Sequence, residues 1–242
     1  MQNSLVLSDV SKIFLQGDET CIVLDHISYE FKQGTSYAIM GISGSGKSTL
    51  LSLLAGIDKP TGGQAVLKRG ASFGDKMSDT GIALHEYATA LPREFFHQTV
   101  GIVFQTPYLI HELSVLENVF IKGLIAGQAL DACKEKAIRL LESVNLAHKA
   151  ASSCATLSLG EQQRVSLVRA LFCEPAFLLA DEPTAHLDVL NRELMINLIR
   201  DYQSRRSMGI ILTCHDRYVA DKMDVRAEIV HGRLIQHGES LA

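Results

Sequence analysis

The stretch Gly41-Ile42-Ser43-Gly44-Ser45-Gly46-Lys47-Ser48 lies between a predicted strand and a predicted helix, and it decides the fold. It fits the pattern G-x-x-x-x-G-K-S/T, a phosphate loop when it occurs in that context. Glycines let the backbone close around a phosphate, and N–H groups at the helix start point at the anion. We expect Gly41–Thr49 to hold nucleotide phosphates, with Lys47 at the β- and γ-phosphates and the Ser48 hydroxyl on Mg2+. The alternative is a glycine-rich turn that only caps a helix.

Strands and helices alternate outward from this loop. Apolar runs predict buried strands over Ser36–Met40, Val100–Phe104, Ala176–Ala180 and Ile210–Thr213. Helical spacing predicts helices over Lys47–Ala55, Leu130–Val144, Gly160–Phe172 and Leu190–Tyr202. The alternation indicates an α/β fold whose sheet is covered by helices on both faces.

The N-terminal third has a different pattern. The segments that predict antiparallel strands beside the main sheet are Leu5–Val10, Cys21–Phe31 and Gln64–Leu67, with turns at Gly17 and Gly62-Gly63. Residues 70–91 mix Gly, Ser, Asp and Thr with few periodic apolar residues. We interpret them as an irregular surface excursion.

Composition limits the class of protein. The 242 residues are 47% hydrophobic and 21% charged, which excludes a disordered or collagen-like chain, and the length suits one large domain or a compact domain that carries a subdomain. The net charge of -4 gives no basic face, so we expect no nucleic-acid partner. The five cysteines lack metal-site spacing and are interpreted as free thiols in a reducing cytoplasm. We find no signal peptide, and every apolar run falls short of the roughly 20 residues that span a bilayer, so we expect no direct membrane insertion.

A second motif narrows the chemistry. Phe177-Leu178-Leu179-Ala180-Asp181-Glu182 is an apolar strand that ends in two acids. Asp181 can hold Mg2+, and Glu182 can orient and deprotonate a water for attack on a γ-phosphate. An isolated pair of this kind would usually be two solvated acids at a strand end. Pro183-Thr184 and Leu187-Asp188, which follow at once, favour the catalytic interpretation.

These residues and Leu157-Ser158-Leu159-Gly160-Glu161-Gln162-Gln163-Arg164 resemble the nucleotide-binding subunits of ABC transporters over nearly the whole chain. The resemblance implies a P-loop ATPase core with an N-terminal antiparallel β-subdomain and a helical signature subdomain. It places the core and β-subdomain in residues 1–104 and 176–242 of a single 1–242 domain, and the helical subdomain in about 105–175.

The family signature reads LSGGQ, and here Leu159 replaces the first glycine and Glu161 the glutamine. Ser158 and Gly160 keep the positions that the family uses to meet the γ-phosphate of ATP bound on the opposite subunit. Leu159 lies either beside that contact or in the subdomain.

The resemblance also assigns roles to single residues. Gln105 matches a glutamine that touches Mg2+, Asp188 an aspartate that approaches the partner subunit, and His215 a histidine that contacts the γ-phosphate. Phe14 matches the aromatic that stacks on adenine, with core packing as its alternative. The segment between Gln105 and Leu116, which contains Pro107, Tyr108, Leu109 and Ile110, is either a groove for a permease helix or subdomain core.

Within the family the chain is similar to the lipoprotein-releasing (LolD) and macrolide-exporter (MacB) branch. The phrases that carry this likeness are Gly101-Ile102-Val103-Phe104-Gln105, Leu113-Ser114-Val115-Leu116-Glu117-Asn118-Val119 and Ala180-Asp181-Glu182-Pro183-Thr184. The branch usually has Gly-Asn where Ala185-His186 stand here, which indicates a diverged member.

That likeness implies an ATP- and Mg2+-dependent ATPase, peripheral on the cytoplasmic face of the cell membrane. Its partners would be a second copy of itself or a related ATPase subunit, and transmembrane permease subunits that act on lipoproteins, peptides or secreted proteins. The alternative is an ATP-gated regulator of a membrane partner, of the FtsE type. A DNA-repair or translation ATPase would need a coiled-coil insertion or a second cassette, and we find neither.

Overall fold

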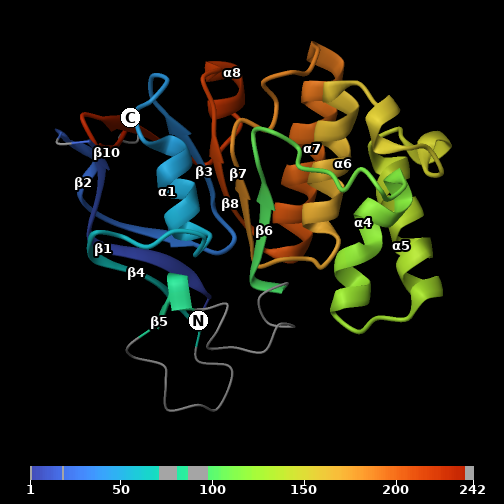
Figure 1. Cartoon of the computed structure of the whole chain (residues 1–242), viewed down its shortest axis with the longest axis horizontal. Helices are drawn as coiled ribbons and strands as arrows, with labels where there is room; N and C mark the ends of the chain where they lie inside the picture. The colour runs from blue at the N-terminus through green and yellow to red at the C-terminus, as the bar shows by residue number, and fades with distance from the viewer. Residues whose placement is uncertain (1, 18, 71–80, 87–97, 238–242) are drawn as a thin grey trace.

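Figure 1 shows the computed structural model of the chain, which describes residues 2–17, 19–70, 81–86 and 98–237. The strands are β1 Ser4–Gln16, β2 Glu19–Lys32, β3 Ser36–Met40, β4 Gly62–Lys68, β5 Ile82–Ala83, β6 Val100–Val103, β7 Phe177–Ala180, β8 Gly209–Thr213, β9 Val225–Val230 and β10 Arg233–Gln236. The α-helices are α1 Lys47–Leu54, α4 Val115–Ile125, α5 Leu130–Ser143, α6 Leu159–Leu171, α7 Val189–Arg206 and α8 Arg217–Ala220. Short 3-10 turns lie at Leu84–Glu86, Ala147–Lys149 and Cys154–Thr156.

The central feature is a six-stranded sheet in the order β10-β9-β3-β8-β7-β6. All neighbours in it pair in parallel except β10, which is antiparallel to β9. The α/β fold and its main strands are therefore confirmed, and β3 has the predicted bounds. Because the parallel strands point the same way, their carboxyl ends meet at one edge of the sheet.

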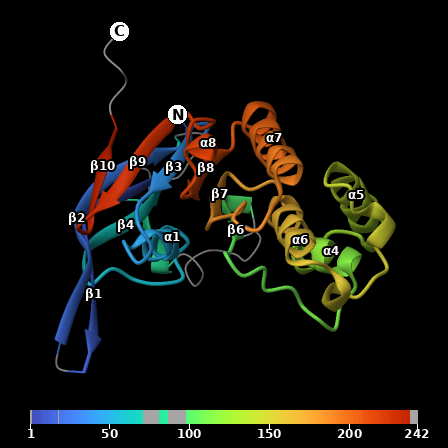
Figure 2. The same ribbon diagram turned by 90° about the horizontal axis from the view of Figure 1, so that it is seen from above.

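Strands β3, β7 and β8 are buried on both faces, and their successive side chains point to opposite sides of the sheet. On one face Ile39, Leu179 and Ile211 pack with α1 and with residues of the second sheet. On the other face Leu178, Ile210 and Leu212 pack against α6, α7 and α8. Figure 2 shows this arrangement from above, with α1 near the antiparallel sheet and helices α4, α5, α6 and α7 on the other side of β7 and β6.

The second sheet is antiparallel, in the order β2-β1-β4-β5. The predicted turn at Gly17 is confirmed, but the turn at Gly62-Gly63 is wrong, because both residues begin strand β4. The register of β1 against β4 shifts between Ser8 and Ser11, and Gly63 has a φ of +73°. The glycine pair therefore accommodates a β-bulge rather than a chain reversal.

The predicted excursion over residues 70–91 is wrong where the structure describes it. Ile82 and Ala83 form β5 on the edge of β4, and the side chain of Leu84 is buried in the core between the sheets. The sequence there is too short to show strand periodicity. Residues 71–80 and 87–91 of that excursion lie outside the described residues.

Helices α4, α5 and α6 enclose a third hydrophobic cluster. The sequence prediction missed α4, which contains Gly123. A Cβ built on Gly123 would lie 2.4 Å from Cε1 of Phe172 and 2.7 Å from Sγ of Cys133, so close packing requires a residue that lowers helix propensity.

All five cysteines are free thiols as expected, and Cys21 alone is exposed. No helix within the described residues is both long and apolar enough to cross a membrane.

The bulge at Gly63 gives a stability prediction. A Cβ at this position would lie 2.2 Å from the carbonyl oxygen of Asp9, so Gly63→Ala adds a backbone clash to an unfavourable φ. We expect it to lower the free energy of unfolding by about 2–5 kcal/mol, measured by urea titration. Gly17→Ala is the matched control, since Gly17 has a φ of +63° but open space around its Cβ. It should cost only about 1–2 kcal/mol, and equal losses would contradict the steric explanation.

Candidate active site

The phosphate loop connects β3 to α1 and is shaped by its glycines. Gly41 has a φ of +145°, and a Cβ there would lie 2.6 Å from Oγ of Ser45. Gly46 has a φ of +105°, and its Cβ would lie 2.9 Å from the carbonyl oxygen of Val23. Only glycine fits both positions without displacing backbone or loop atoms. Ile42, Ser43 and Gly44 are exposed, so the loop is open to a ligand at the N-terminus of α1.

Lys47 is buried and lies across this loop. Its Nζ donates to the carbonyl oxygens of Gly41 at 2.9 Å and Ile42 at 3.1 Å, and it lies 3.3 Å from Nε2 of His215. The ammonium group is therefore fixed at the mouth of the loop, where a phosphate would meet it. The Oγ of Ser45 is buried without a hydrogen-bond partner among the described residues, which leaves one polar group of the loop unsatisfied.

The second half of the site is the end of strand β7. The backbone N–H of Asp181 donates to the carbonyl oxygen of Val103 at 2.8 Å, which ties it to β6. Asp181 and Ser48 both line a cavity of about 120 Å³ between α1 and the sheet. Mg2+ is typically bound through one or two carboxylates together with phosphate oxygens and water. A hydroxyl and a carboxylate facing one cavity beside a phosphate loop fit that ion.

Glu182 and His215 contact each other across the sheet edge. Oε1 of Glu182 lies 2.6 Å from Nε2 of His215, the same nitrogen that Lys47 approaches. A carboxylate and an ammonium group make opposite demands on one nitrogen, since the first accepts a proton and the second donates one. We assign the Nε2 proton to the shorter contact with Glu182, which leaves Lys47 as an electrostatic neighbour.

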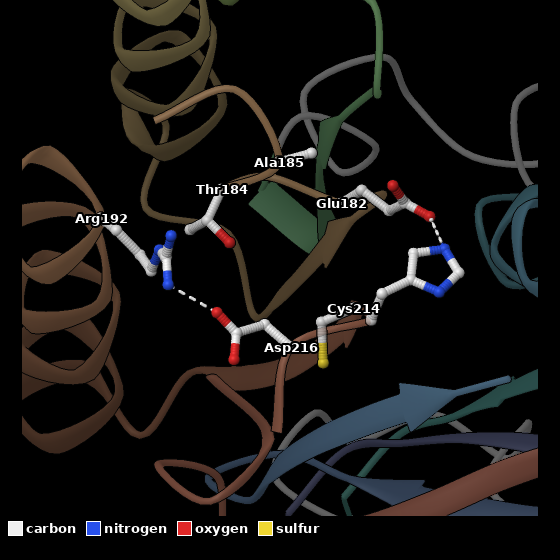
Figure 3. Close-up of a pocket in the computed structure, with 7 residues that line it drawn as sticks. Glu182, Thr184, Ala185, Arg192, Cys214 and Asp216 are labelled. Atoms are coloured by element: carbon white, nitrogen blue, oxygen red, sulfur yellow. Dashed lines mark hydrogen bonds and ion pairs between the residues drawn. The ribbon is translucent and has the colours of Figure 1, made fainter. Parts of the chain in front are cut away.

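A pocket of about 310 Å³ opens beside this pair, and Figure 3 shows Glu182 on one side of it with Arg192 and Asp216 on the other. Its lining residues are Glu182, Thr184, Ala185, Arg192, Cys214, His215 and Asp216. Nη1 of Arg192 lies 2.5 Å from Oδ2 of Asp216, so helix α7 is joined to the segment that carries His215. Burial raises the pKa of the Cys214 thiol to about 12, which keeps this pocket thiol protonated and unreactive.

The signature residues stand at the start of α6. Ser158 is the N-cap, its backbone N–H donates to Oε2 of Glu161 at 2.8 Å, and its Oγ accepts from the Glu161 N–H. Lys149 Nζ lies 2.6 Å from Oε1 of Glu161. Its hydrogen bond is the largest of the contributions that lower the pKa of that carboxyl. Glutamate at the place of the family glutamine therefore completes a capping box and an ion pair.

Leu159 is 44% exposed, so it points to solvent rather than into the helical core. A Cβ on Gly160 would lie 3.0 Å from Cδ2 of Leu187, so the signature helix packs on the segment after Glu182. Asp188 in that segment is exposed and caps α7 by accepting from the N–H of Asn191 at 2.8 Å. Bonds from Asn191 lower the pKa of the Asp188 carboxyl.

The structure thus brings together some of the predicted site residues and leaves others apart. Gly41–Ser48, Asp181, Glu182 and His215 converge. Ser158 and Gly160 line neither cavity beside the phosphate loop, as far as the described residues show, and Figures 1 and 2 place α6 beyond β7 from α1. Gln105 is exposed just after β6 and lines neither cavity in the same part of the chain.

Phe14 lies on β1 and is 40% exposed, so core packing is wrong for it. Nζ of Lys12 lies over its ring, 4.9 Å from the ring centre, so this partly exposed aromatic ring carries a cation on one face.

Sequence reasoning missed the residues that shape the segment after Gln105. Buried Asn118 donates from Nδ2 to the carbonyl oxygens of Ile110 and Ser114, and its Oδ1 accepts from the Ile110 N–H. Arg169 on α6 donates to the carbonyl oxygens of Pro107 and Tyr108. Asn118 lies in the motif Leu113–Val119, but its bonds to Ile110 require the chain to reverse between the two residues, and no local pattern shows that reversal.

The segment Pro107 to Ile110 divides between the two predicted roles. Pro107 and Leu109 are buried, whereas Tyr108 and Ile110 are exposed at 66% and 41%. Alternate residues therefore anchor the segment in the helical core and present apolar side chains outward.

Comparison with known proteins agrees with this geometry. The family model described as "ABC transporter" matches residues 24–185. The lipoprotein-releasing system ATP-binding protein LolD of Pseudomonas syringae pv. tomato is 36% identical over 238 residues, 98% of this chain and 100% of that protein. The LolD protein of Treponema denticola is 34% identical over 230 residues, 95% of this chain and 96% of that protein.

Two solved structures have the same fold. A dimeric bacterial ABC transporter cassette aligns with a TM-score of 0.86 at 28% identity, covering 98% of this chain and 99% of that one. A dimeric post-hydrolysis state of an ATP-binding cassette bound to ADP and Pi aligns with a TM-score of 0.85 at 28% identity, with the same coverage.

Proposed function

The chain belongs to the ABC transporter family and is an ATP hydrolase of that family, and we propose that it powers a separate membrane permease that releases lipoproteins. The observation that carries the proposal is the convergence of the phosphate loop, Glu182 and His215 at one sheet edge. Likeness to lipoprotein-releasing ATP-binding proteins over 95% or more of the chain supports the branch. On this proposal the chain lies on the cytoplasmic face of the membrane, bound to the permease.

The proposed binding roles rest on the family resemblance, and the geometry supports some of them. Backbone N–H groups of Gly41, Ile42, Ser43, Gly44, Ser45, Gly46, Lys47, Ser48 and Thr49 would surround the ATP phosphates, and Phe14 would stack on the adenine. Ser48 and Asp181 would hold Mg2+, joined by Gln105 if that exposed side chain turns inward. Bound Mg2+ supplies positive charge that neutralises the phosphate oxygens.

The proposed chemistry centres on the contact between Glu182 and His215. In the structure His215 donates to the carboxylate that would serve as base, so Glu182 Oε1 is occupied. A γ-phosphate beside Lys47 offers the His215 N–H a more strongly charged acceptor. Once His215 turns to the phosphate, Glu182 is free to accept a proton from the attacking water. The binding of ATP would therefore free Glu182, the base that its hydrolysis requires.

The second nucleotide contact would come from another subunit. Ser158 and Gly160 are exposed or half-buried at the N-terminus of α6 and line neither cavity beside the phosphate loop of the same chain, in the part that the structure describes. We infer that two chains, either two copies or two related subunits, enclose ATP head to tail, with Asp188 near the partner. Exposed Leu159 would then face the partner's nucleotide.

The segment after Gln105 is the proposed permease contact. Tyr108 and Ile110 present apolar side chains, and Asn118 and Arg169 hold the backbone beneath them. A regulator of the FtsE type would use the same ATPase, so the two functions differ in what the membrane partner does.

Glu182→Gln should leave ATP binding intact and suppress hydrolysis, because an amide cannot accept the proton of the water. Loss of a positioned base should reduce steady-state phosphate release at saturating ATP by about 100- to 10,000-fold. Glu142→Gln, an exposed change on α5, is the control and should hydrolyse at the wild-type rate. A normal rate for Glu182→Gln would remove this residue from the proposed role.

Cysteines at Ser43 and Ser158 should crosslink between two chains, and only when ATP closes the dimer. The background needs only Cys21→Ser, because the other four cysteines are buried. Adding Glu182→Gln keeps ATP bound during the reaction, and the product is read as a dimer band on a non-reducing gel. Ser43→Cys with Glu142→Cys should give no dimer, and equal yield without nucleotide would exclude the proposed closure.

Depletion of the chain in its own cells tests the cargo. On the proposed function, lipoproteins should accumulate in the membrane that holds the permease instead of being released from it, as measured by membrane fractionation. Wild-type chain should restore sorting, and Glu182→Gln should not. Normal lipoprotein sorting with failure of cell-wall remodelling would favour the regulator instead.

A further inference from the structure

Thr213 connects the two acids at the end of β7. Its Oγ1 donates to Oδ1 of Asp181 at 2.6 Å and accepts from the backbone N–H of Glu182 at 2.9 Å. The residue is completely buried at the end of the neighbouring strand β8. One hydroxyl thus bonds to the two consecutive residues that follow strand β7.

This contact follows from the parallel pairing of β7 and β8. Ala180 lies opposite Leu212, so the next residue of each strand brings Thr213 beside Asp181. The hydroxyl has one proton, and the Asp181 carboxylate can only accept it, so the direction of that bond is fixed. The lone pairs of Oγ1 then remain for the Glu182 N–H. The Thr213 hydroxyl and the Glu182 N–H are therefore both hydrogen-bonded, and leaving either unpaired in a buried position would be costly.

The consequence for Asp181 is a fixed carboxylate. Oδ1 is held by Thr213, and Oδ2 has no hydrogen-bond partner within the described residues. Asp181 also lines the cavity that contains Ser48. A carboxylate with one oxygen bonded and the other free is suited to hold a metal, because the bond limits its rotation.

The consequence for Glu182 is a fixed backbone. Glu182 has a φ of +45°, a backbone conformation that is unfavourable for a residue with a side chain. The bond from its N–H to Thr213 holds this conformation, and the side chain reaches His215 from it. Thr213 ends strand β8, and His215 lies two residues further along the chain. The end of β8 therefore supplies both the hydroxyl that bonds to the Glu182 backbone and the imidazole that contacts the Glu182 carboxylate.

We propose that Thr213 is a positioning residue for the ATPase reaction, which sets the Asp181 carboxylate and the Glu182 backbone through a single hydroxyl. The inference rests on the proposed roles of Asp181 and Glu182. It predicts that loss of the hydroxyl impairs both Mg2+-dependent nucleotide binding and turnover.

The chain contains a matched control at the opposite end of the same sheet. Ser36 is equally buried at the start of β3, its Oγ donates to Oδ2 of Asp224 at 2.8 Å, and it accepts from the Asp224 N–H at 3.0 Å. β3 and β8 are parallel, with Ser36 opposite Ile210. Ser36 therefore lies about 10 Å before Thr213 along the strands and makes the same kind of contact away from the cavities.

The test compares Thr213→Val, Thr213→Ala, Thr213→Ser and Ser36→Ala. Calorimetry would measure the affinity for a non-hydrolysable ATP analogue with Mg2+ and with EDTA, beside the kcat for ATP and the melting temperature. Thr213→Val and Thr213→Ala should lower the Mg2+-dependent gain in affinity and the kcat by about 10- to 100-fold each. Their affinity in EDTA should stay within about twofold of wild type, since the phosphate loop itself is unchanged.

Two comparisons separate positioning from stability. Thr213→Ser keeps the hydroxyl and should restore both quantities to within about threefold. Ser36→Ala should lower the melting temperature as much as the Thr213 variants while leaving kcat and the Mg2+ effect unchanged. Should Thr213→Val not fold, Thr213→Ala carries the same prediction with a smaller side chain.

Wild-type Mg2+ dependence and kcat in Thr213→Ala would overturn the proposal. An equal loss in Ser36→Ala, or no recovery in Thr213→Ser, would overturn it as well. A wild-type chain without Mg2+-dependent binding would instead contradict the proposed roles of Asp181 and Ser48, so the two failures are distinguishable.

Discussion

The parallel pairing of β3, β8 and β7 fixes where every part of the candidate site lies. It brings three carboxyl strand ends to one edge, and each end carries a different part of the site: the phosphate loop, Asp181 with Glu182, and Thr213 with His215. Because these three strands are buried on both faces, they cannot shift by one residue without moving core side chains to the wrong face. The core thereby fixes the distances within the site.

The charged and polar side chains at this sheet edge are arranged so that an anion can bind there. The Lys47 ammonium bonds to loop carbonyls, and Glu182 and His215 satisfy each other. Lys47 and His215 each have an acceptor that a phosphate could replace, so the binding of ATP would exchange their internal contacts for stronger charge-assisted ones. This exchange couples nucleotide binding to the state of the base without any movement of the sheet.

The helical part of the chain presents surfaces rather than building a second site. Its signature helix begins with a capping box that uses Glu161, which explains how glutamate can replace the family glutamine without loss of helix stability. Asn118 and Arg169 hold the backbone after Gln105, so that buried Pro107 and Leu109 alternate with exposed Tyr108 and Ile110. Exposed Leu159 adds an apolar side chain where the family has glycine, and it faces outward with Ser158.

The phosphate loop, the bounds of β3, the acids after β7 and the family could all be predicted from the sequence, because glycine spacing and apolar runs are local patterns. The sequence did not determine α4, whose Gly123 is explained by Phe172 and Cys133, or the bulge at Gly63, which is set by the backbone of Asp9. The exposure of Leu159, the bond between His215 and Glu182, and the link from Asp181 through the Thr213 hydroxyl to Glu182 are seen only in the folded chain. These contacts join residues more than 30 positions apart, and their existence depends on strand order and register, which no local pattern records.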